Sequence, residues 1–205
     1  SVNVPVWLCS SWVKASGPDA AARIGWAHQP EPPLDLTIAP AGDSVQWAET
    51  LGGQILIPGT VRLPRAQNVP TLEGFEDGAW WVQDVAASLP ARILLASLDS
   101  PPTAHIADLC AAPGGKTAQL CLSGATVTAI DRSASRLKRL RKNLARLGLS
   151  ATVIAEDAVG WRPPEPLDGV LLDAPCTATG TIRRRPDILW AKDPTSADKM
   201  SGVQA

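Results

Sequence analysis

The sequence predicts an α/β fold in which a doubly wound parallel-sheet domain follows a small α+β subdomain. Two observations support this expectation. From residue 80 onward, short apolar runs alternate with helical patterns, which is typical of βαβ units. Before residue 80, short elements are separated by prolines and glycines, and the acidic, glycine-rich stretch 70–79 indicates a junction. We therefore expect domains at residues 1–75 and 76–205.

The N-terminal part combines helix and strand patterns. Leu34, Leu36 and Ile38 alternate with polar residues, which predicts a half-buried strand. Gly52 and Gly53 are expected to end a helix that covers residues 43–51. The prolines of the loop 29–33 exclude a helix there. In chain order, we expect helices at 4–14, 18–28 and 43–51 and strands at 34–38, 54–58 and 61–64.

The C-terminal part predicts a parallel sheet that is covered on both faces. The clearest element is the helix from Ser133, because leucines recur at helical spacing on one face while the other face carries six cations. Such a basic face is either a solvated surface, which is the commoner case, or an RNA contact. We expect strands at 80–83, 104–110, 126–130, 151–155 and 168–173, with helices at 84–98, from 116 and from 133.

Composition places the chain among soluble globular proteins, since it is 45% hydrophobic and 19% charged with a mean hydropathy of +0.02. It has no long apolar run and no secretory signal, so we expect a cytoplasmic protein without a membrane partner. Four cysteines without a C-x-x-C pair and two histidines predict no metal site. Residues 101–205 carry 14 Lys/Arg against 10 Asp/Glu, so a polyanion would prefer this half. The sequence indicates no oligomeric state.

The strongest local signal is IADLCAAPGGKTAQL, residues 106–120. A strand that ends at Asp108 enters a glycine-rich turn and then a helix, which directs backbone N–H groups toward a bound ligand. The turn could also use glycine only for its φ angles. A Walker A loop, G-x-x-x-x-G-K-[ST], is matched at Gly115-Lys116-Thr117, but Cys110 replaces its first glycine.

Acidic residues after the next two strands favour a nucleoside ligand without a polyphosphate. Asp131 follows the second strand, 16 residues after Gly115, where a carboxylate accepts hydrogen bonds from both ribose hydroxyls. Asp157 follows the third strand, where it could accept from the exocyclic amine of an adenine. Acids that merely lie at the surface after a strand are about equally common.

A second signal is GVLLDAPCTATGTIRRRPDILW, residues 169–190. Its apolar strand brings Asp173 and Cys176 to the same sheet edge as the glycine turn. A lone cysteine is more often an inert buried residue, but Cys176 lies in a polar loop. Cations follow it at Arg183, Arg184 and Arg185, and guanidinium groups attract a phosphodiester backbone.

Taken together, DLCAAPGGKT (108–117), Asp131, Asp157 and DAPCTATGTIRRRPDILW (173–190) resemble bacterial RNA cytosine-5 methyltransferases of the Sun/Fmu family, which methylate 16S ribosomal RNA. The resemblance covers about residues 80–200, and the I-R-R-x-P-D-x-x-W pattern is similar to the ribosomal branch. The stretches PVWL and EPPLDLTI resemble the small subdomain that precedes catalysis in this family.

The resemblance implies a Rossmann-like class I methyltransferase domain, S-adenosylmethionine as methyl donor and ribosomal RNA as partner. Carried over by position, Asp131 would hold the ribose, Asp157 would lie at the adenine, and Asp173 would stand beside the donor and the target cytosine. Arg183–Arg185 would contact RNA. The loop around the methionine moiety would be formed by Cys110, Ala111, Ala112, Pro113, Gly114, Gly115 and Lys116.

Enzymes of this family use two cysteines. A thiolate adds to carbon 6 of cytosine and turns the ring into an enamine that attacks the methyl group. Cys176 matches the D-A-P-C cysteine, which is associated with product release, while the nucleophile belongs to a later T-C motif not present in these 205 residues. We therefore expect a domain truncated at its C-terminus that does not turn over alone. The alternatives are a transfer-RNA cytosine-5 methyltransferase, a nucleoside triphosphatase and a non-catalytic RNA-binding scaffold.

Overall fold

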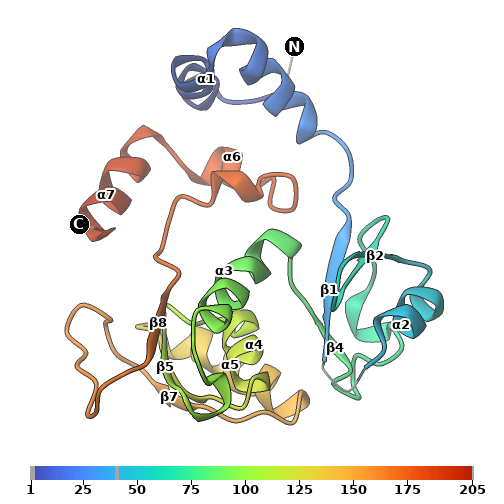
Figure 1. The fold of residues 1–205 in the computed structure, drawn as a ribbon. Helices are drawn as coiled ribbons and strands as arrows, with labels where there is room; N and C mark the ends of the chain where they lie inside the picture. The colour runs from blue at the N-terminus through green and yellow to red at the C-terminus, as the bar shows by residue number, and fades with distance from the viewer. Residues whose placement is uncertain (1–2, 40–41, 205) are drawn as a thin grey trace. The chain divides into compact units, whose positions relative to one another are not determined.

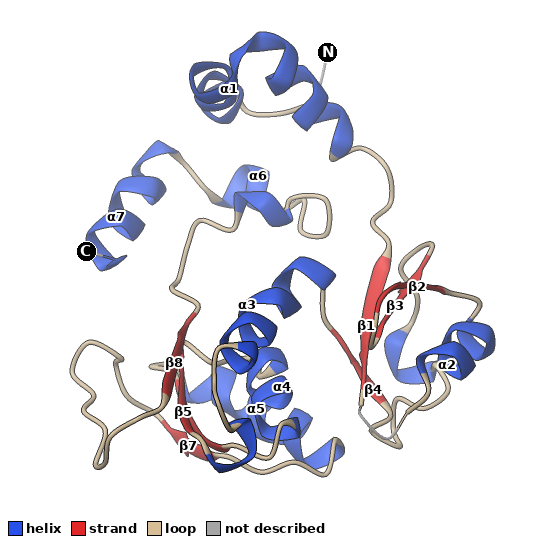
Figure 2. Ribbon diagram, viewed as in Figure 1, coloured by secondary structure: helices blue, strands red, loops and turns tan. Residues whose placement is uncertain are grey.

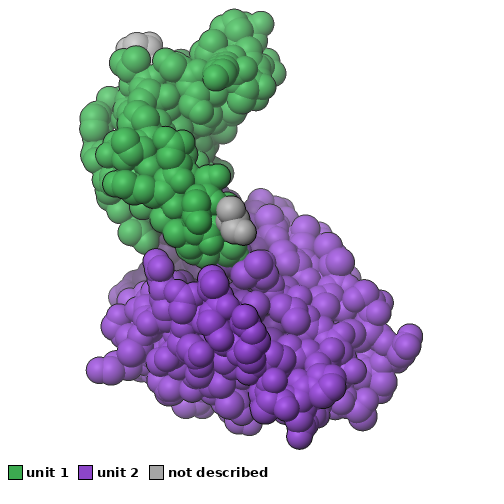
Figure 3. All heavy atoms as spheres, turned by 90° about the vertical axis from the view of Figure 1, so that its left-hand side faces the viewer, with its two compact units in different colours: residues 1–32, 174–205 green, residues 33–173 purple. Residues whose placement is uncertain are grey.

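The computed structural model describes residues 3–39 and 42–204, and contacts divide the chain into two compact units (Figure 3). The larger unit is residues 33–173, and the other joins residues 1–32 with 174–205. These units are defined by contacts between residues, and this division does not test domain boundaries along the sequence. The expected domains at 1–75 and 76–205 therefore stay a prediction.

A four-stranded parallel sheet forms one half of the larger unit (Figure 1). The chain adds strands outward from the first one and then returns to its other side, so the strand order reverses next to the first strand. Ligands of open α/β sheets bind at the carboxyl ends of the strands at such a switch point. In spatial order, the strands are β7 (Thr152–Ile154), β6 (Thr126–Ile130), β5 (His105–Leu109) and β8 (Gly169–Leu172).

Three helices lie on one face of this sheet (Figure 2). Helix α5 buries Leu137, Leu140 and Leu144 against Ala129 of β6, as their spacing predicts. The Ser133 side chain accepts a hydrogen bond from the backbone N–H of Arg136 and so fixes the start of this helix. The helices are α3 (Val85–Ala96), α4 (Gly115–Leu122) and α5 (Ala134–Arg146).

The opposite face of the sheet packs against the irregular connection between β7 and β8. No helix forms in this connection, residues 155–168, where three prolines disfavour one. Trp161 and Leu167 of this irregular segment pack on the sheet instead. On β8, Val170 and Leu172 keep 50% and 62% of their surface exposed.

The open edge of strand β8 leads us to expect that this chain associates in solution. In the described part of the chain it pairs only with β5, so its other side presents unpaired backbone groups beside exposed Val170 and Leu172. Such an edge promotes association between strands. We expect concentration-dependent association in sedimentation velocity, and less of it in a Val170→Lys variant. A monomer with a cooperative melt at all concentrations contradicts this prediction.

The other half of the larger unit is an antiparallel sheet, whose core includes Leu36, Val61, Leu63 and Trp80. Its last strand, Trp80–Val82, pairs with Leu36–Ile38, so the placement of residues 80–83 at the start of the parallel domain is wrong. Strand propensity identifies a strand but not its partner. In spatial order, the strands are β2 (Gln54–Ile57), β3 (Thr60–Leu63), β1 (Leu34–Ile38) and β4 (Trp80–Val82).

Strand β1 is buried on both faces, so its expected half-buried pattern is wrong. Asp35 and Thr37 are only 6% and 4% exposed. Arg62 donates two hydrogen bonds to the Asp35 carboxylate, and the Val85 backbone N–H donates a third. A buried charge is tolerated when it is paired and hydrogen-bonded in this way. Helix α2 (Ser44–Leu51) covers this sheet and, as expected, ends at Gly52 in the left-handed conformation.

The second unit contains the helix α1 (Val6–Ala27), which Gly17 interrupts with a φ of 80° and so divides into the two expected helical pieces. Leu8 of α1 packs with Ile182 and Ile188. No helix in the described part of the chain is both long and apolar enough to cross a membrane. The remaining helices are α6 (Ile188–Ala191) and α7 (Pro194–Gln204), with short 3-10 turns at Val69–Thr71, Pro101–Thr103 and Thr179–Thr181.

Candidate functional site

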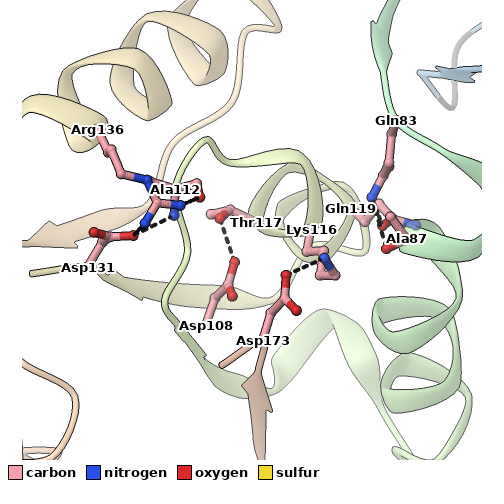
Figure 4. Close-up of polar contacts among 10 residues, drawn as sticks. All are labelled: Gln83, Ala87, Asp108, Ala112, Lys116, Thr117, Gln119, Asp131, Arg136 and Asp173. Atoms are coloured by element: carbon pink, nitrogen blue, oxygen red, sulfur yellow. Dashed lines mark hydrogen bonds and ion pairs between the residues drawn. The ribbon is translucent and has the colours of Figure 1, made fainter. Parts of the chain in front are cut away.

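The loop after β5 lies at the switch point of the parallel sheet (Figure 4). Cys110 begins the loop with a φ of 64°, and the Ala112–Pro113 peptide is cis. The backbone N–H of Ala111 donates to the Ile130 carbonyl at 2.9 Å, and that of Gly114 donates to the Ala111 carbonyl at 2.9 Å. The Ala112 N–H donates to Asp131 Oδ2 at 3.2 Å. Three amides of the loop are thus used within the protein, whereas a Walker A loop offers its amides to phosphate.

The two glycines of the loop have different structural roles. Gly114 has a φ of 103°, and a Cβ placed there would lie 2.9 Å from Leu140 Cγ of α5. A Cβ on Gly115 would lie 3.5 Å from Trp81 Nε1 and 3.6 Å from Gln83, which is ordinary contact. The fold therefore requires glycine at position 114 but not at 115.

Gly114→Ala is expected to destabilise the chain by about 2 kcal/mol, because it combines a left-handed backbone with a close approach to Leu140. Gly115→Ala is the matched control, and it should change the free energy of unfolding by less than about 0.5 kcal/mol. Urea denaturation of both variants measures these values. Equal losses in the two variants contradict the assigned roles.

Asp108 lies under this loop and is 1% exposed. Thr117 donates a hydrogen bond from its hydroxyl to Asp108 Oδ2 at 2.5 Å, while Oδ1 is buried without a hydrogen-bond partner. Burial raises the pKa of the Asp108 carboxyl to about 6, with Thr117 opposing the shift. A buried carboxylate oxygen without a donor fits a ligand that carries a donor or a positive charge.

Asp131 follows β6 and is 3% exposed. Besides the Ala112 N–H, it accepts a hydrogen bond from the Ser133 N–H at 2.9 Å, and it forms an ion pair with Arg136 Nη1 at 3.1 Å. The Arg136 side chain is 55% exposed, and it also donates to the Ala112 carbonyl. Arg136 therefore links Asp131 to the loop carbonyl of Ala112 from the solvent side.

Asp173 follows β8 on the other side of the switch point. Lys116 donates from Nζ to Asp173 Oδ2 at 2.7 Å, so the ion pair links the start of α4 to the end of β8 (Figure 4). The Asp173 side chain is 60% exposed and can reach a ligand from solvent.

Asp157 follows β7 and is exposed, with Oδ1 accepting a hydrogen bond from the Val159 N–H. Its charge acts on Cys110, the first residue of the loop. Burial raises the pKa of the Cys110 thiol, and the charges of Asp131, Asp173 and Asp157 raise it further. The three predicted acids follow β6, β7 and β8, so they lie at the same edge of the sheet as the loop.

Two buried glutamines support the loop from behind, and the sequence analysis did not identify them. Gln83 accepts from Thr37 and from the Trp81 indole at 3.0 Å each, and it donates to Gln119 Oε1 at 2.7 Å. Gln119 in turn donates to the Ser88 carbonyl. The network connects the antiparallel sheet to α4, directly behind Gly115. A buried polar residue on an apolar helix face was the signal that could have indicated it.

Cys176 and the three arginines belong to the other unit. Cys176 is exposed. Arg183 donates to the backbone carbonyls of Pro30 and Glu31, and Arg185 pairs with Asp187 through two hydrogen bonds. Arg184 also makes an interaction within the protein. These side chains therefore have structural partners, and their contact with RNA stays a prediction.

The switch point has a distinctive charge distribution. Asp108, Asp131, Asp157 and Asp173 lie around one loop, against the cations Lys116 and Arg136. Carboxylates in such a group attract a cationic ligand and repel a triphosphate. Within residues 3–39 and 42–204, no three His, Cys, Asp or Glu side chains could together hold a metal ion. The group of carboxylates thus disfavours the triphosphatase alternative, and three amides of the loop already have acceptors within the protein.

Comparison with known sequences identifies relatives. The family model described as 16S rRNA methyltransferase RsmB/F matches residues 95–205. The ribosomal RNA small subunit methyltransferase B of Shigella flexneri is 37% identical over 214 residues, covering 98% of this chain and 49% of the relative. The protein of the same name from Escherichia coli K12 gives the same identity and coverage, 37%, 98% and 49%. The chain thus spans about half the length of the curated relatives it matches.

Solved structures confirm the Rossmann-like α/β fold. The crystal structure of PH0851 has a TM-score of 0.87 at 26% identity, covering 98% of this chain and 48% of that one. A methyltransferase homologue protein from Pyrococcus horikoshii gives 0.69 at 27% identity, over 89% and 63% of the two chains. NSun6 from Pyrococcus horikoshii with SFG shares the fold, with a TM-score of 0.82 at 18% identity over 98% and 77%. Because the family model covers more than half of the sequence, the resemblance to the Sun/Fmu enzymes is confirmed, and the chain belongs to the family of 16S rRNA methyltransferases RsmB/F.

Proposed function

We propose that this chain is the cofactor-binding part of an enzyme that transfers a methyl group from S-adenosylmethionine to carbon 5 of a cytosine in 16S ribosomal RNA. Membership in the RsmB/F family supports the reaction and the substrate. The observation that carries the cofactor assignment is the group of carboxylates at the switch point, with the unpartnered Oδ1 of Asp108 beneath the glycine loop. S-adenosylmethionine carries a sulfonium and an ammonium group, so its charge suits this group of acids.

The residues of the site fit the parts of such a cofactor. Asp131 would accept hydrogen bonds from the ribose hydroxyls once Arg136 moves away from its Oδ2. Asp157 would lie at the adenine, because it follows the strand next to that of Asp131. The loop Cys110–Lys116 would surround the methionine moiety, and Asp108 Oδ1 would face its ammonium group.

When bound, S-adenosylmethionine supplies an electrophilic methyl group. Asp173 would lie beside this group and the target base, held by its ion pair with Lys116. Cys176 would assist product release, as the resemblance implies for the D-A-P-C cysteine, and the attacking thiolate would come from a T-C motif outside these residues. Arg183–Arg185 would contact the RNA backbone near the target.

A direct test uses a polypeptide that completes these residues with the parts of the Escherichia coli relative that lie outside the match. Tritium-labelled S-adenosylmethionine and unmodified 16S rRNA should yield labelled 5-methylcytidine after digestion. Label in a different nucleoside overturns the proposed reaction. Preferential labelling of transfer RNA in a parallel reaction favours the transfer-RNA alternative over the ribosomal one.

A further inference from the structure

The helix α5 and its flanks carry an unusual concentration of positive charge that the site does not account for. Residues 132–155 contain seven cations and no acid. In a solvated helix face, acids normally alternate with cations, because pairs three or four residues apart stabilise a helix while like charges destabilise it. The seven cations are Arg132, Arg136, Lys138, Arg139, Arg141, Lys142 and Arg146.

Three of these cations have structural partners. Arg136 pairs with Asp131, Arg141 donates to the Val153 carbonyl, and Arg146 donates to the carbonyls of Phe75 and Trp80. The other four are exposed and make no hydrogen bond or ion pair with any residue that the structure describes: Arg132, Lys138, Arg139 and Lys142.

The unpaired cations lie together on the surface. At 100° per residue, Lys138, Arg139 and Lys142 fall on the side of α5 opposite its buried leucines. Lys138 and Lys142 are one turn apart, so their charges repel each other. Arg132 precedes the helix and directly follows Asp131, so the four cations span a stretch of about 15 Å that begins next to Asp131.

The helix that presents these charges is held rigidly. Asn143 donates to the Pro113 carbonyl at 2.9 Å and Arg136 donates to the Ala112 carbonyl, so α5 is attached to the glycine loop at two points. Arg146 attaches its far end, where its guanidinium also lies 4.0 Å from the Phe75 ring. Because the helix backbone is already ordered, binding of a polyanion would have to order only the side chains of these cations.

We propose that Arg132, Lys138, Arg139 and Lys142, here named the α5 basic face, bind the phosphodiester backbone of RNA as a second contact surface beside the cofactor site. The choice of RNA among polyanions rests on the proposed function. A row of four cations contacts backbone rather than bases, so it adds affinity and orientation without adding sequence specificity.

The test is fluorescence anisotropy of this chain with a labelled single-stranded RNA of mixed sequence and about 20 nucleotides, titrated at several salt concentrations. In the Lys138→Gln/Arg139→Gln/Lys142→Gln variant, the slope of log K against log salt should fall by about 2, because each lost phosphate contact removes about 0.7. Affinity at low salt should fall at least tenfold. The melting temperature should stay equal or rise, since like-charge repulsion is removed.

A Lys14→Gln/Arg23→Gln/Arg65→Gln variant is the matched control, because these exposed cations lie elsewhere and their loss changes the net charge equally. Equal losses of RNA affinity in both variants, or no RNA binding by the unmodified chain, overturn the proposal. Calorimetry with S-adenosylmethionine separates this proposal from the proposed function. Cofactor affinity should be the same in all three proteins, and a chain that binds RNA through α5 but no S-adenosylmethionine contradicts only the proposed function.

Discussion

Asp131→Ala is expected to weaken S-adenosylmethionine binding at least tenfold. The substitution removes a buried acceptor for two ribose hydroxyls, and each hydrogen bond to a charged acceptor contributes about 1.5–3 kcal/mol. It also frees the Ala112 N–H, which Asp131 holds at 3.2 Å, so the loop loses a support together with the ligand. Isothermal titration calorimetry on the two proteins measures the difference.

Arg136→Met provides the control for this experiment. Arg136 occupies Asp131 Oδ2 from the solvent side, and its removal leaves the acceptor in place with one competitor fewer. We expect the affinity of Arg136→Met to be equal to or higher than that of the unmodified chain. If Asp131→Ala binds as tightly as the unmodified chain, the ribose assignment is wrong. If Arg136→Met loses as much affinity as Asp131→Ala, the two residues act through the fold instead.

The affinity for S-adenosylmethionine should also depend on pH through Asp108. Burial raises its pKa to about 6, and a positively charged ligand prefers the ionised carboxylate. If only the ionised form binds, the dissociation constant at pH 5 should be roughly tenfold higher than at pH 7. Calorimetry at the two pH values should show this change in the unmodified chain, and Asp108→Asn should lack it.

The same shift has the opposite effect on folding. Because the pKa of Asp108 is higher in the folded chain than in the unfolded one, its protonated form is the one that folding favours. The stability it supplies is complete below about pH 4 and is lost as pH rises through about 6, by an amount on the order of 2–3 kcal/mol. Urea denaturation between these pH values should show the loss, and Asp108→Asn should flatten it. A pH-independent midpoint in the unmodified chain contradicts the assignment.

Much of the fold followed from local patterns. The leucines of α5, the glycine stop after α2 and the apolar runs of β5, β6 and β8 all predicted the observed elements, because each depends on residues close in sequence. The partner of Trp80–Val82 was not predictable in this way. Strand pairing depends on distant residues, which local patterns do not reveal.

The candidate site was predictable as far as strand ends determine it. Asp131, Asp157 and Asp173 each follow a parallel strand, so topology alone gathers them at one edge, next to Asp108 near the end of β5. The side chains that support this edge of the sheet do not occupy positions that strand topology determines. Gln83 and Gln119 meet across 36 residues of sequence, and Arg136 reaches back to a loop carbonyl 24 residues earlier. Only the folded chain shows these contacts.

The central claim is that the acids at the switch point bind a cationic nucleoside and not a nucleotide triphosphate. Calorimetry of this chain with S-adenosylmethionine and with ATP, at pH 7 and equal concentrations, tests it most directly. We predict saturable binding of S-adenosylmethionine that Asp131→Ala weakens, and no measurable binding of ATP. Saturable ATP binding without a response to S-adenosylmethionine would contradict the account.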